Sequence, residues 1–587
     1  MIPVRQYWQL LYRYLRPQGR QAVLLGLLMT ATITVQLVNP QLLRFFIDTA
    51  LSGSDTSVLL PGAVVFIVLA LLHQGLAVVS TYVAETVGWT ATNGLRRDLA
   101  DHLLRLDMGF HKTRTPGELI ERIDGDITAL SNFFSQFTIH VAGNLLLSIG
   151  IVALLFRENL WIGGALSVFA MFALVFMVLM QRIAVPWWKA QRERSAEFYG
   201  FLSEQFGGTE DVRGNGAGGF MMRRFTQIHR KWLPDVIKAH FGFATMWSSN
   251  ILVFSVGFAI VYWLGDRFLG SGDLTVGSVY LVFHYTEMLR QPLERIRGQM
   301  EDLQKAAASI ERVRELLALE SKLDQSADGD LPSGALAVEF DRVTFFYDDD
   351  DDGDGNGEIV LHDLAFRLEA GRVLGVLGRT GSGKTTLARL LTRLYDPQSG
   401  RVQVGTFDVR DVALQSLRGR VGMVTQDVQL FRATVRENLT FFDAAVSDEH
   451  LYEVLTDLGL ADWVFSLPQG LDTYLESGGG GLSAGEAQLL AFTRIFLKNP
   501  GLVILDEASS RLDPATEQLI ERAVDKLLHR RTGMVIAHRL ATVTRADDIL
   551  ILDGGRIVEF GPRAELAAND GSRFAGLLRS GIEEVLT

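Results

Sequence analysis

The chain of 587 residues contains no cysteine. This absence excludes a disulfide framework and any metal site built from thiolates. An excess of basic charge is also missing, because the formal net charge is −12 and the pI is about 5.5. A protein that mainly binds nucleic acid would carry the opposite charge, so nucleic acid is not expected as a partner.

Charged residues are missing from several long stretches in the first half of the chain. A membrane-spanning helix needs about 20 apolar residues. Buried helices of a soluble protein would explain one such stretch but not five, and a sixth, shorter one can begin a crossing. We therefore predict six membrane-spanning helices. The six stretches without Asp, Glu, Lys or Arg are 21–43, 56–84, 127–156, 159–181, 239–265 and 274–286.

Basic residues between these stretches indicate the orientation. Segment 85–126 holds six Lys and Arg residues and segment 182–238 holds ten. The positive-inside rule places both segments in the cytoplasm, together with both termini. We expect a multi-pass protein of the cell membrane, of the bacterial inner or plasma membrane kind. Helices two to five are expected to continue beyond the bilayer into the cytoplasm.

From about residue 334 the sequence changes to short β-rich runs. The segment RVLGVLGRTGSGKTTLARLL, residues 372–391, has the pattern of a buried strand, a Gly-rich turn and a helix, and it contains G-x-x-x-x-G-K-[ST]. Glycines let backbone N–H groups surround phosphates, and the helix N-terminus adds a positive end. The candidate phosphate-binding residues are Gly378, Thr380, Gly381, Ser382, Gly383, Lys384, Thr385 and Thr386.

A second segment, GLVILDEASSRLDP, supplies carboxylates. Its apolar run 502–505 predicts a buried strand that ends in Asp506 and Glu507. An acid at the carboxyl end of a strand beside a phosphate loop can hold Mg²⁺, with Thr385 as a further ligand. The next acid can orient the attacking water.

At this point the chain resembles the ATP-binding-cassette (ABC) proteins. The segment GGGGLSAGEAQLLAFTR, residues 478–494, resembles their signature segment, VTQDVQLF their glutamine loop and VIAHRL their switch histidine. Because six predicted spans precede these motifs in the sequence, the chain resembles a half-transporter of the multidrug or lipid exporter type. The implied fold is a six-helix transmembrane domain extended into the cytoplasm, 1–318, a linker, 319–333, and an α/β P-loop nucleotide-binding domain, 334–587.

The resemblance implies roles for individual residues and two cofactors, ATP and Mg²⁺. Tyr347 would stack on the adenine, and Asp506, Thr385 and Gln426 would hold Mg²⁺. Three residues would take part in hydrolysis: Glu507 as the base, His538 at the γ-phosphate, and Gln426 as the sensor of Mg²⁺ and the attacking water.

The signature segment implies a second subunit, because Ser483 and Gly485 would close over ATP held by another half-transporter. Here the sequence reads LSAGE where the family has LSGGQ. The Cβ of Ala484 could crowd the γ-phosphate, and Glu486 adds a negative charge near it. Together with intact catalytic acids, this favours one half of a heterodimer; a homodimer that tolerates both residues is the alternative.

Two further features bear on coupling and on the substrate path. Gly and Pro punctuate 108–123 and 209–220, as expected for the cytoplasmic tips between long helices. In the sixth span, His284, Glu287 and Arg290 share one helix face at spacings of three. They either line a translocation cavity or lie at the cytoplasmic membrane interface.

The acidic run DDDDDGDGNGE, residues 348–358, looks like a calcium loop, but neither register supplies the Glu that an EF-hand needs at position 12. We expect a solvated loop and no calcium.

The sequence therefore predicts ATP-driven export of an unidentified amphipathic substrate, a drug, lipid or peptide, by alternating access. One alternative is an importer built on the exporter fold, which a measured transport direction would reveal. Another is a nucleotide-gated channel or regulator without net transport, against which the intact Glu507 and His538 argue.

Overall fold

The computed structural model describes residues 12–53, 56–136, 141–347, 358–425, 428–476, 482–506, 514–537 and 540–580. The chain divides into two compact units. The helical unit comprises Met1–Leu104 and Pro116–Leu319, and the α/β unit comprises Arg105–Thr115 and Glu320–Thr587.

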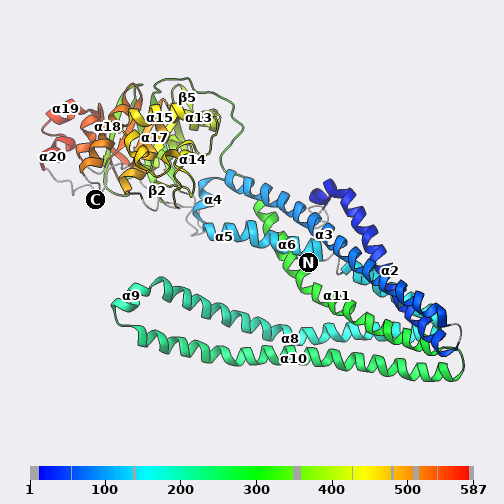
Figure 1. Ribbon diagram of the computed structural model, residues 1–587. Coiled ribbons are helices and arrows are strands. Elements are labelled where there is room, and N and C mark those ends of the chain that lie inside the picture. The colour runs from blue at the N-terminus through cyan, green and yellow to red at the C-terminus, as the bar shows by residue number, and fades with distance from the viewer. Residues whose placement is uncertain are drawn as a thin grey trace. The chain divides into compact units, whose positions relative to one another are not determined.

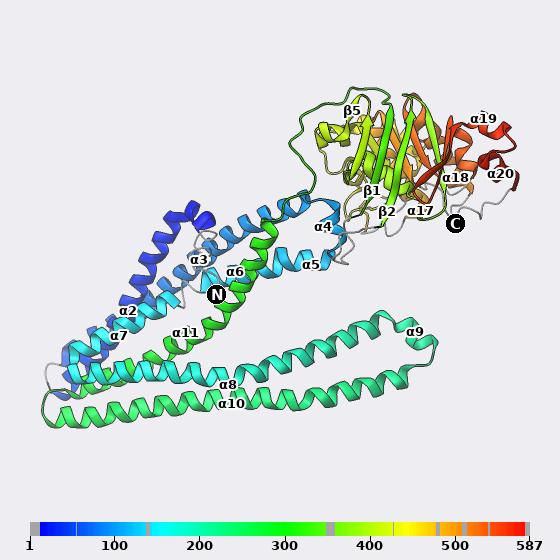
Figure 2. The ribbon, with the colours of Figure 1, turned by 180° about the vertical axis from the view of Figure 1, so that it is seen from behind.

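Five helices in the described residues are long and apolar enough to cross a membrane: Tyr12–Leu51, Leu59–Arg105, Val141–Glu158, Leu160–Gly207 and Gly218–Gly270. They contain the elements α2 (Gly19–Leu51), α3 (Leu59–Arg105), α7 (Asn144–Glu158), α8 (Leu160–Gly207) and α10 (Gly218–Gly270), all labelled in Figure 2. Helix α11 (Val276–Leu317) follows at the sixth predicted span and packs against α2, α7 and α10. The predicted class, a domain of long helices followed by an α/β domain, is confirmed.

Helices α8 and α10 run side by side in both ribbon views and are joined by the short helix α9 (Thr209–Gly214) (Figures 1 and 2). They have 48 and 53 residues, which at 1.5 Å per residue is more than twice the roughly 30 Å of a bilayer core. Gly257 of α10 lies under the ring of Phe169, where any Cβ would collide with it. This close approach explains a glycine inside a long helix.

A buried polar cluster ties the start of α6 (Ile127–Gln136) to the far part of α11. Asp126 ends a π-helical turn, Glu121–Asp126, and is 3% exposed. Its carboxylate accepts hydrogen bonds from the hydroxyl of Ser309, at 2.9 Å, and from Nε of Arg312, at 3.0 Å, and it also pairs with Nη2 of Arg312. Arg122 approaches the same carboxylate at 3.4 Å. Short helix α5 (Pro116–Ile120) precedes this turn.

The α/β unit contains two sheets. An antiparallel sheet has the order β2-β1-β4-β5, and the central sheet has the order β10-β9-β3-β8-β7-β6, in which β9, β3, β8, β7 and β6 are parallel. The strands are β1 (Val338–Phe346), β2 (Ile359–Leu368), β3 (Val373–Gly378), β4 (Ser399–Val404), β5 (Phe407–Asp408), β6 (Val421–Val424), β7 (Leu502–Asp506), β8 (Thr532–Ile536), β9 (Asp548–Asp553) and β10 (Arg556–Pro562).

Helices cover the central sheet, and every residue of β3, β7 and β8 is buried. The same unit contains α4 (Met108–Lys112), a short helix at the first predicted tip. The other helices are α12 (Lys384–Leu391), α13 (Leu414–Arg420), α14 (Val435–Thr440), α15 (Asp448–Asp457), α16 (Ala461–Ser466), α17 (Ala484–Lys498), α18 (Pro514–Leu528), α19 (Arg563–Ala568) and α20 (Arg573–Ser580).

Candidate functional site

The Gly-rich turn connects the central strand β3 to helix α12. Gly378, Gly381 and Gly383 all have positive φ angles, of 154°, 82° and 98°. A Cβ on Gly378 would collide with the carbonyl of Leu552, and one on Gly383 would lie 2.5 Å from a methyl of Leu361. The turn therefore requires glycine at both positions, and it leads directly into the N-terminus of α12, where N–H groups can bind an anion.

Two polar side chains of this turn are almost completely buried. The ammonium of Lys384, 5% exposed, donates to the carbonyl oxygens of Gly378 and Arg379 at 2.6 and 3.0 Å. The hydroxyl of Ser382, 3% exposed, has no hydrogen-bond partner among the described residues. A buried cation and an unsatisfied hydroxyl beside a helix N-terminus fit the phosphates of a nucleotide.

The predicted carboxylate lies where the sequence indicates. Asp506 ends β7, is 5% exposed, and pairs in register with Ile536 of β8, the strand between β7 and β3. It is therefore at the same edge of the sheet as the Gly-rich turn, as is Thr385 in the first turn of α12. Gln426, Glu507 and His538 lie outside the described residues, as does most of the acidic run, 348–357.

Tyr347 follows β1 and lies beside α12. Its hydroxyl shares a hydrogen bond of 3.0 Å with the Thr386 hydroxyl and accepts one of 2.9 Å from Nη1 of Arg389. The rings of Phe345 and Tyr395 meet the Tyr347 ring at nearly right angles, with centroids 4.8 and 5.1 Å away. These contacts hold an aromatic ring next to α12.

The signature serine is the N-cap of α17 in a reciprocal capping box. The Ser483 hydroxyl accepts from the backbone N–H of Glu486, at 3.2 Å. In return Oε2 of Glu486 lies 2.7 Å from the backbone N and 2.9 Å from the hydroxyl of Ser483. The other oxygen, Oε1, accepts from the indole of Trp463 at 2.7 Å. Ala484 is exposed and Gly485 is buried. The contact with Trp463 was not predicted, because 23 residues separate the partners.

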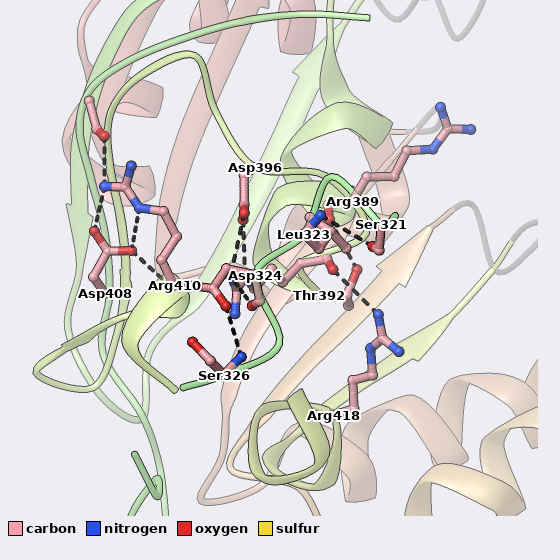
Figure 3. A network of polar contacts seen from close by, with 12 residues as sticks. Ser321, Leu323, Asp324, Ser326, Arg389, Thr392, Asp396, Asp408, Arg410 and Arg418 are labelled. Carbon is pink, nitrogen blue, oxygen red and sulfur yellow. Dashed lines mark hydrogen bonds and ion pairs between the residues drawn. The ribbon is translucent and has the colours of Figure 1, made fainter. Parts of the chain in front are cut away.

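The segment after α11 belongs to the α/β unit and is held there by the polar network in Figure 3. Arg393, 1% exposed and with a positive φ of 47°, donates to the Asp324 carbonyl at 2.8 Å and to the Asp396 carboxylate at 3.0 Å. Hydrogen bonds from the side chain of Ser326 and from its backbone N–H, the latter at 2.9 Å, hold the pKa of the Asp324 carboxyl below its usual value. No sequence motif indicated a structural role for Arg393. The feature that reveals this role is the complete burial of its side chain, which only the folded structure shows.

Comparison with known proteins now identifies the two units. A family model described as "ABC transporter transmembrane region" matches residues 23–293, and one described as "ABC transporter" matches residues 361–510. A fatty acid ABC transporter ATP-binding/permease protein of Mycobacterium tuberculosis is 32% identical over 81% of this chain and 74% of its own length. The chain belongs to the ABC transporter family.

Two further relatives extend over almost the whole chain. A putative multidrug export ATP-binding/permease protein of Bacillus subtilis is 28% identical over 94% of this ABC transporter and 96% of its own length. The structure of a bacterial Atm1-family ABC exporter with ATP bound superposes with a TM-score of 0.78, at 26% identity, over 96% of this chain and 99% of that one.

These likenesses confirm the main functional predictions. The chain is a multi-pass membrane protein of the bacterial exporter type, a half-transporter that dimerises, and an ATPase that binds ATP and is coupled to export.

Proposed function

We propose that this ABC transporter exports amphipathic molecules with a cationic head, and that α11 supplies the surface that recognises the head. One observation carries this proposal. Glu287, Arg290 and Glu294 form a ladder on α11, with an Arg290–Glu287 distance of 3.3 Å and an Arg290–Glu294 distance of 3.9 Å. The ladder has one more acid than base.

The depth of the ladder favours a path through the protein. Glu287 is eleven residues after the start of α11 at Val276, about 16 Å along a helix that needs roughly 30 Å to cross the hydrocarbon core. Ionisable groups at that depth avoid lipid and face water or a partner. This supports the cavity interpretation over the membrane-interface one.

The two faces of α11 differ accordingly. Leu281, Tyr285 and Leu289 are fully buried against the rest of the helical unit. On the other face the side chains of Arg290 and Glu287 are 46% and 44% exposed, and the rings of Tyr280 and His284 are stacked one turn before them. Excess carboxylate and an aromatic pair suit a cationic head, through charge and cation–π attraction.

A matched pair of amphiphiles tests this proposal. In liposomes, an alkyltrimethylammonium should stimulate ATP hydrolysis and be transported, whereas a fatty acid of the same chain length should do neither. Glu287→Gln should reduce the stimulation relative to the variant's own basal rate, and Glu311→Gln, on the same helix beyond the membrane, should not. Stimulation by the fatty acid alone would refute the cationic head and favour the substrate named for the mycobacterial relative.

We further propose that Mg²⁺ accompanies ATP, held by the Thr385 hydroxyl, Asp506 and Gln426. The buried carboxylate at the end of β7 and the hydroxyl at the start of α12 are hard oxygen donors of the kind Mg²⁺ prefers. The ion would neutralise charge on the phosphates. Asp506→Asn should weaken binding of ATP with Mg²⁺ but not of ATP with EDTA; equal loss in both conditions would contradict the assignment.

We propose that Tyr347 stacks on the adenine, that the residues of the Gly-rich turn bind the phosphates, and that Glu507 and His538 serve hydrolysis with Gln426. The fixed ring of Tyr347 beside α12 supports the first role. Glu507→Gln should keep ATP binding while lowering turnover by roughly 10²-fold or more, as expected for a lost general base. Near-normal turnover would contradict that role.

We propose that the partner is a different half-transporter. Ser483 and Gly485 would meet the γ-phosphate in the partner's site, yet the Glu486 carboxylate already engages both the N–H and the hydroxyl of Ser483. That engagement makes this signature a weak closing surface, whereas Glu507 would serve a site completed by the partner. The chain purified alone should show the mass of a monomer and little turnover. A stable homodimer with two equivalent active sites would contradict the heterodimer.

A basic groove in the α/β unit supports a docking role for the second tip. The cavity, of about 940 Å³, is lined by Phe441, Arg494 and Lys498 among others, and burial lowers the pKa of Arg494 to about 10. Exposed Glu210 and Asp211 begin α9, so we propose that α9 of one half enters this groove of the other. Reversing both acids to lysine should abolish substrate stimulation; unchanged stimulation would refute the docking.

A further inference from the structure

A lysine of the first cytoplasmic tip lies on the ring proposed to stack on adenine. The ammonium of Lys112, the last residue of α4, is over the Tyr347 ring, 4.9 Å from its centroid. Phe345 and Tyr395 contact Tyr347 at nearly right angles, and Arg389 binds its hydroxyl. Both Lys112 and Tyr347 belong to the α/β unit.

The tip is fixed in this unit by contacts that do not involve Tyr347. Asp107 caps α4 by accepting from the backbone N–H of Phe110 at 3.2 Å, and its other oxygen accepts from that of Lys322 at 2.9 Å. The Gln325 amide donates to the Arg105 carbonyl at 3.1 Å. A cavity of about 210 Å³ lies between Asp107, the segment after α11 and the aromatic residues Phe345 and Tyr395. The backbone at Lys112 is therefore placed independently of the ring that Lys112 covers.

We propose that Lys112 and the adenine base compete for the same face of Tyr347, so that the position of the Lys112 side chain depends on whether a base is bound. The proposal rests on the proposed stacking role of Tyr347. Stacked atoms approach to about 3.5 Å. An ammonium over the ring occupies that space, so a base arriving on this face must displace it.

Lys112 lies where the adenine base would bind, so competition for the Tyr347 ring can be distinguished from simple attraction between the lysine and the phosphates. A positive charge near the site would strengthen the binding of any polyphosphate, with or without a base. Competition for the ring acts in the opposite direction, and only on ligands that carry a base. Inorganic tripolyphosphate, which has no base, therefore distinguishes the two effects.

The test measures the dissociation constants of ATP and of tripolyphosphate for the full-length protein in lipid nanodiscs. Mg²⁺ is omitted so that ATP is not hydrolysed. Lys112→Met should lower the Kd of ATP about two- to five-fold, the effect of losing one partly exposed cation–π contact, and leave the Kd of tripolyphosphate unchanged. Lys112→Arg should restore the native Kd of ATP. Arg114→Met removes a charge from the same tip beside Phe110 and should change neither constant.

Three results would overturn the proposal: an unchanged Kd of ATP in Lys112→Met, a raised one, or an equal change for both ligands. Tyr347→Ala separates this failure from that of the proposed function. If Tyr347→Ala weakens ATP binding but Lys112→Met does not strengthen it, only the competition is refuted. If Tyr347→Ala leaves ATP binding unchanged, the stacking role fails and the competition fails with it.

Discussion

Replacing Asp126 by Asn should lower the free energy of unfolding of the helical unit more than breaking any exposed ion pair on α11 does. The carboxylate is buried and accepts from Ser309 and Arg312, with Arg122 close by. Asparagine has nearly the same shape, so the change removes the charge without opening a cavity. The guanidinium groups of Arg122 and Arg312 then have no negatively charged partner in common.

The size of the effect follows from burial. Removing one member of a fully buried pair costs about 3–5 kcal/mol. Because the Arg312 side chain is 39% exposed and can turn to water, we expect about 2–3 kcal/mol. Breaking the exposed pair Glu311–Arg314, with an N–O distance of 2.7 Å, with Glu311→Gln should cost at most about 1 kcal/mol.

The pH of the measurement matters. Burial acts to raise the pKa of Asp126, but the hydrogen bonds from Arg312 and Ser309 outweigh it, and the pKa is lowered from its ordinary value of 3.8. The stabilisation is therefore fully present above pH 3.8 and is lost as the pH falls through the lowered pKa. Denaturant unfolding of both variants in detergent at pH 7 tests the reasoning. A loss in Asp126→Asn no greater than in Glu311→Gln would refute it.

Two further pairs of substitutions test the Gly-rich turn and the signature segment. Gly378→Ala should abolish ATP binding because the added Cβ meets the Leu552 carbonyl. At Gly381 the Cβ meets no atom within 4 Å, so Gly381→Ala carries only the strain of alanine at a positive φ of 82° and should weaken binding less; equal affinities in a titration would contradict this. Glu486→Ala removes the capping box and the acceptor of the Trp463 indole, so the free energy of unfolding should fall by about 1–2 kcal/mol. Glu486→Gln keeps a side-chain oxygen as acceptor and should lose less than half of that free energy. Identical losses in the two variants would refute the importance of the hydrogen bonds that the Glu486 side chain accepts.

The sequence predicted what local pattern determines. The absence of charge predicted five long helices that the structure contains, and the Gly-rich segment predicted a turn between a buried strand and a helix, where Lys384 lies. Contacts between distant segments gave no such signal. Asp126 and Arg312 are 186 positions apart, and Lys112 is separated from Tyr347 by the last four predicted spans. Neither pair leaves a periodic signal in the sequence, so these contacts can be recognised only in the folded chain.

The most direct test of ATP-driven export is transport by the reconstituted complex. Liposomes whose α/β units face outward, the cytoplasmic side, should accumulate an alkyltrimethylammonium probe when ATP and Mg²⁺ are added, and liposomes with Glu507→Gln should not. Loss of preloaded probe from the liposomes on addition of ATP, or equal accumulation with the Glu507→Gln protein, would contradict export driven by hydrolysis at this site.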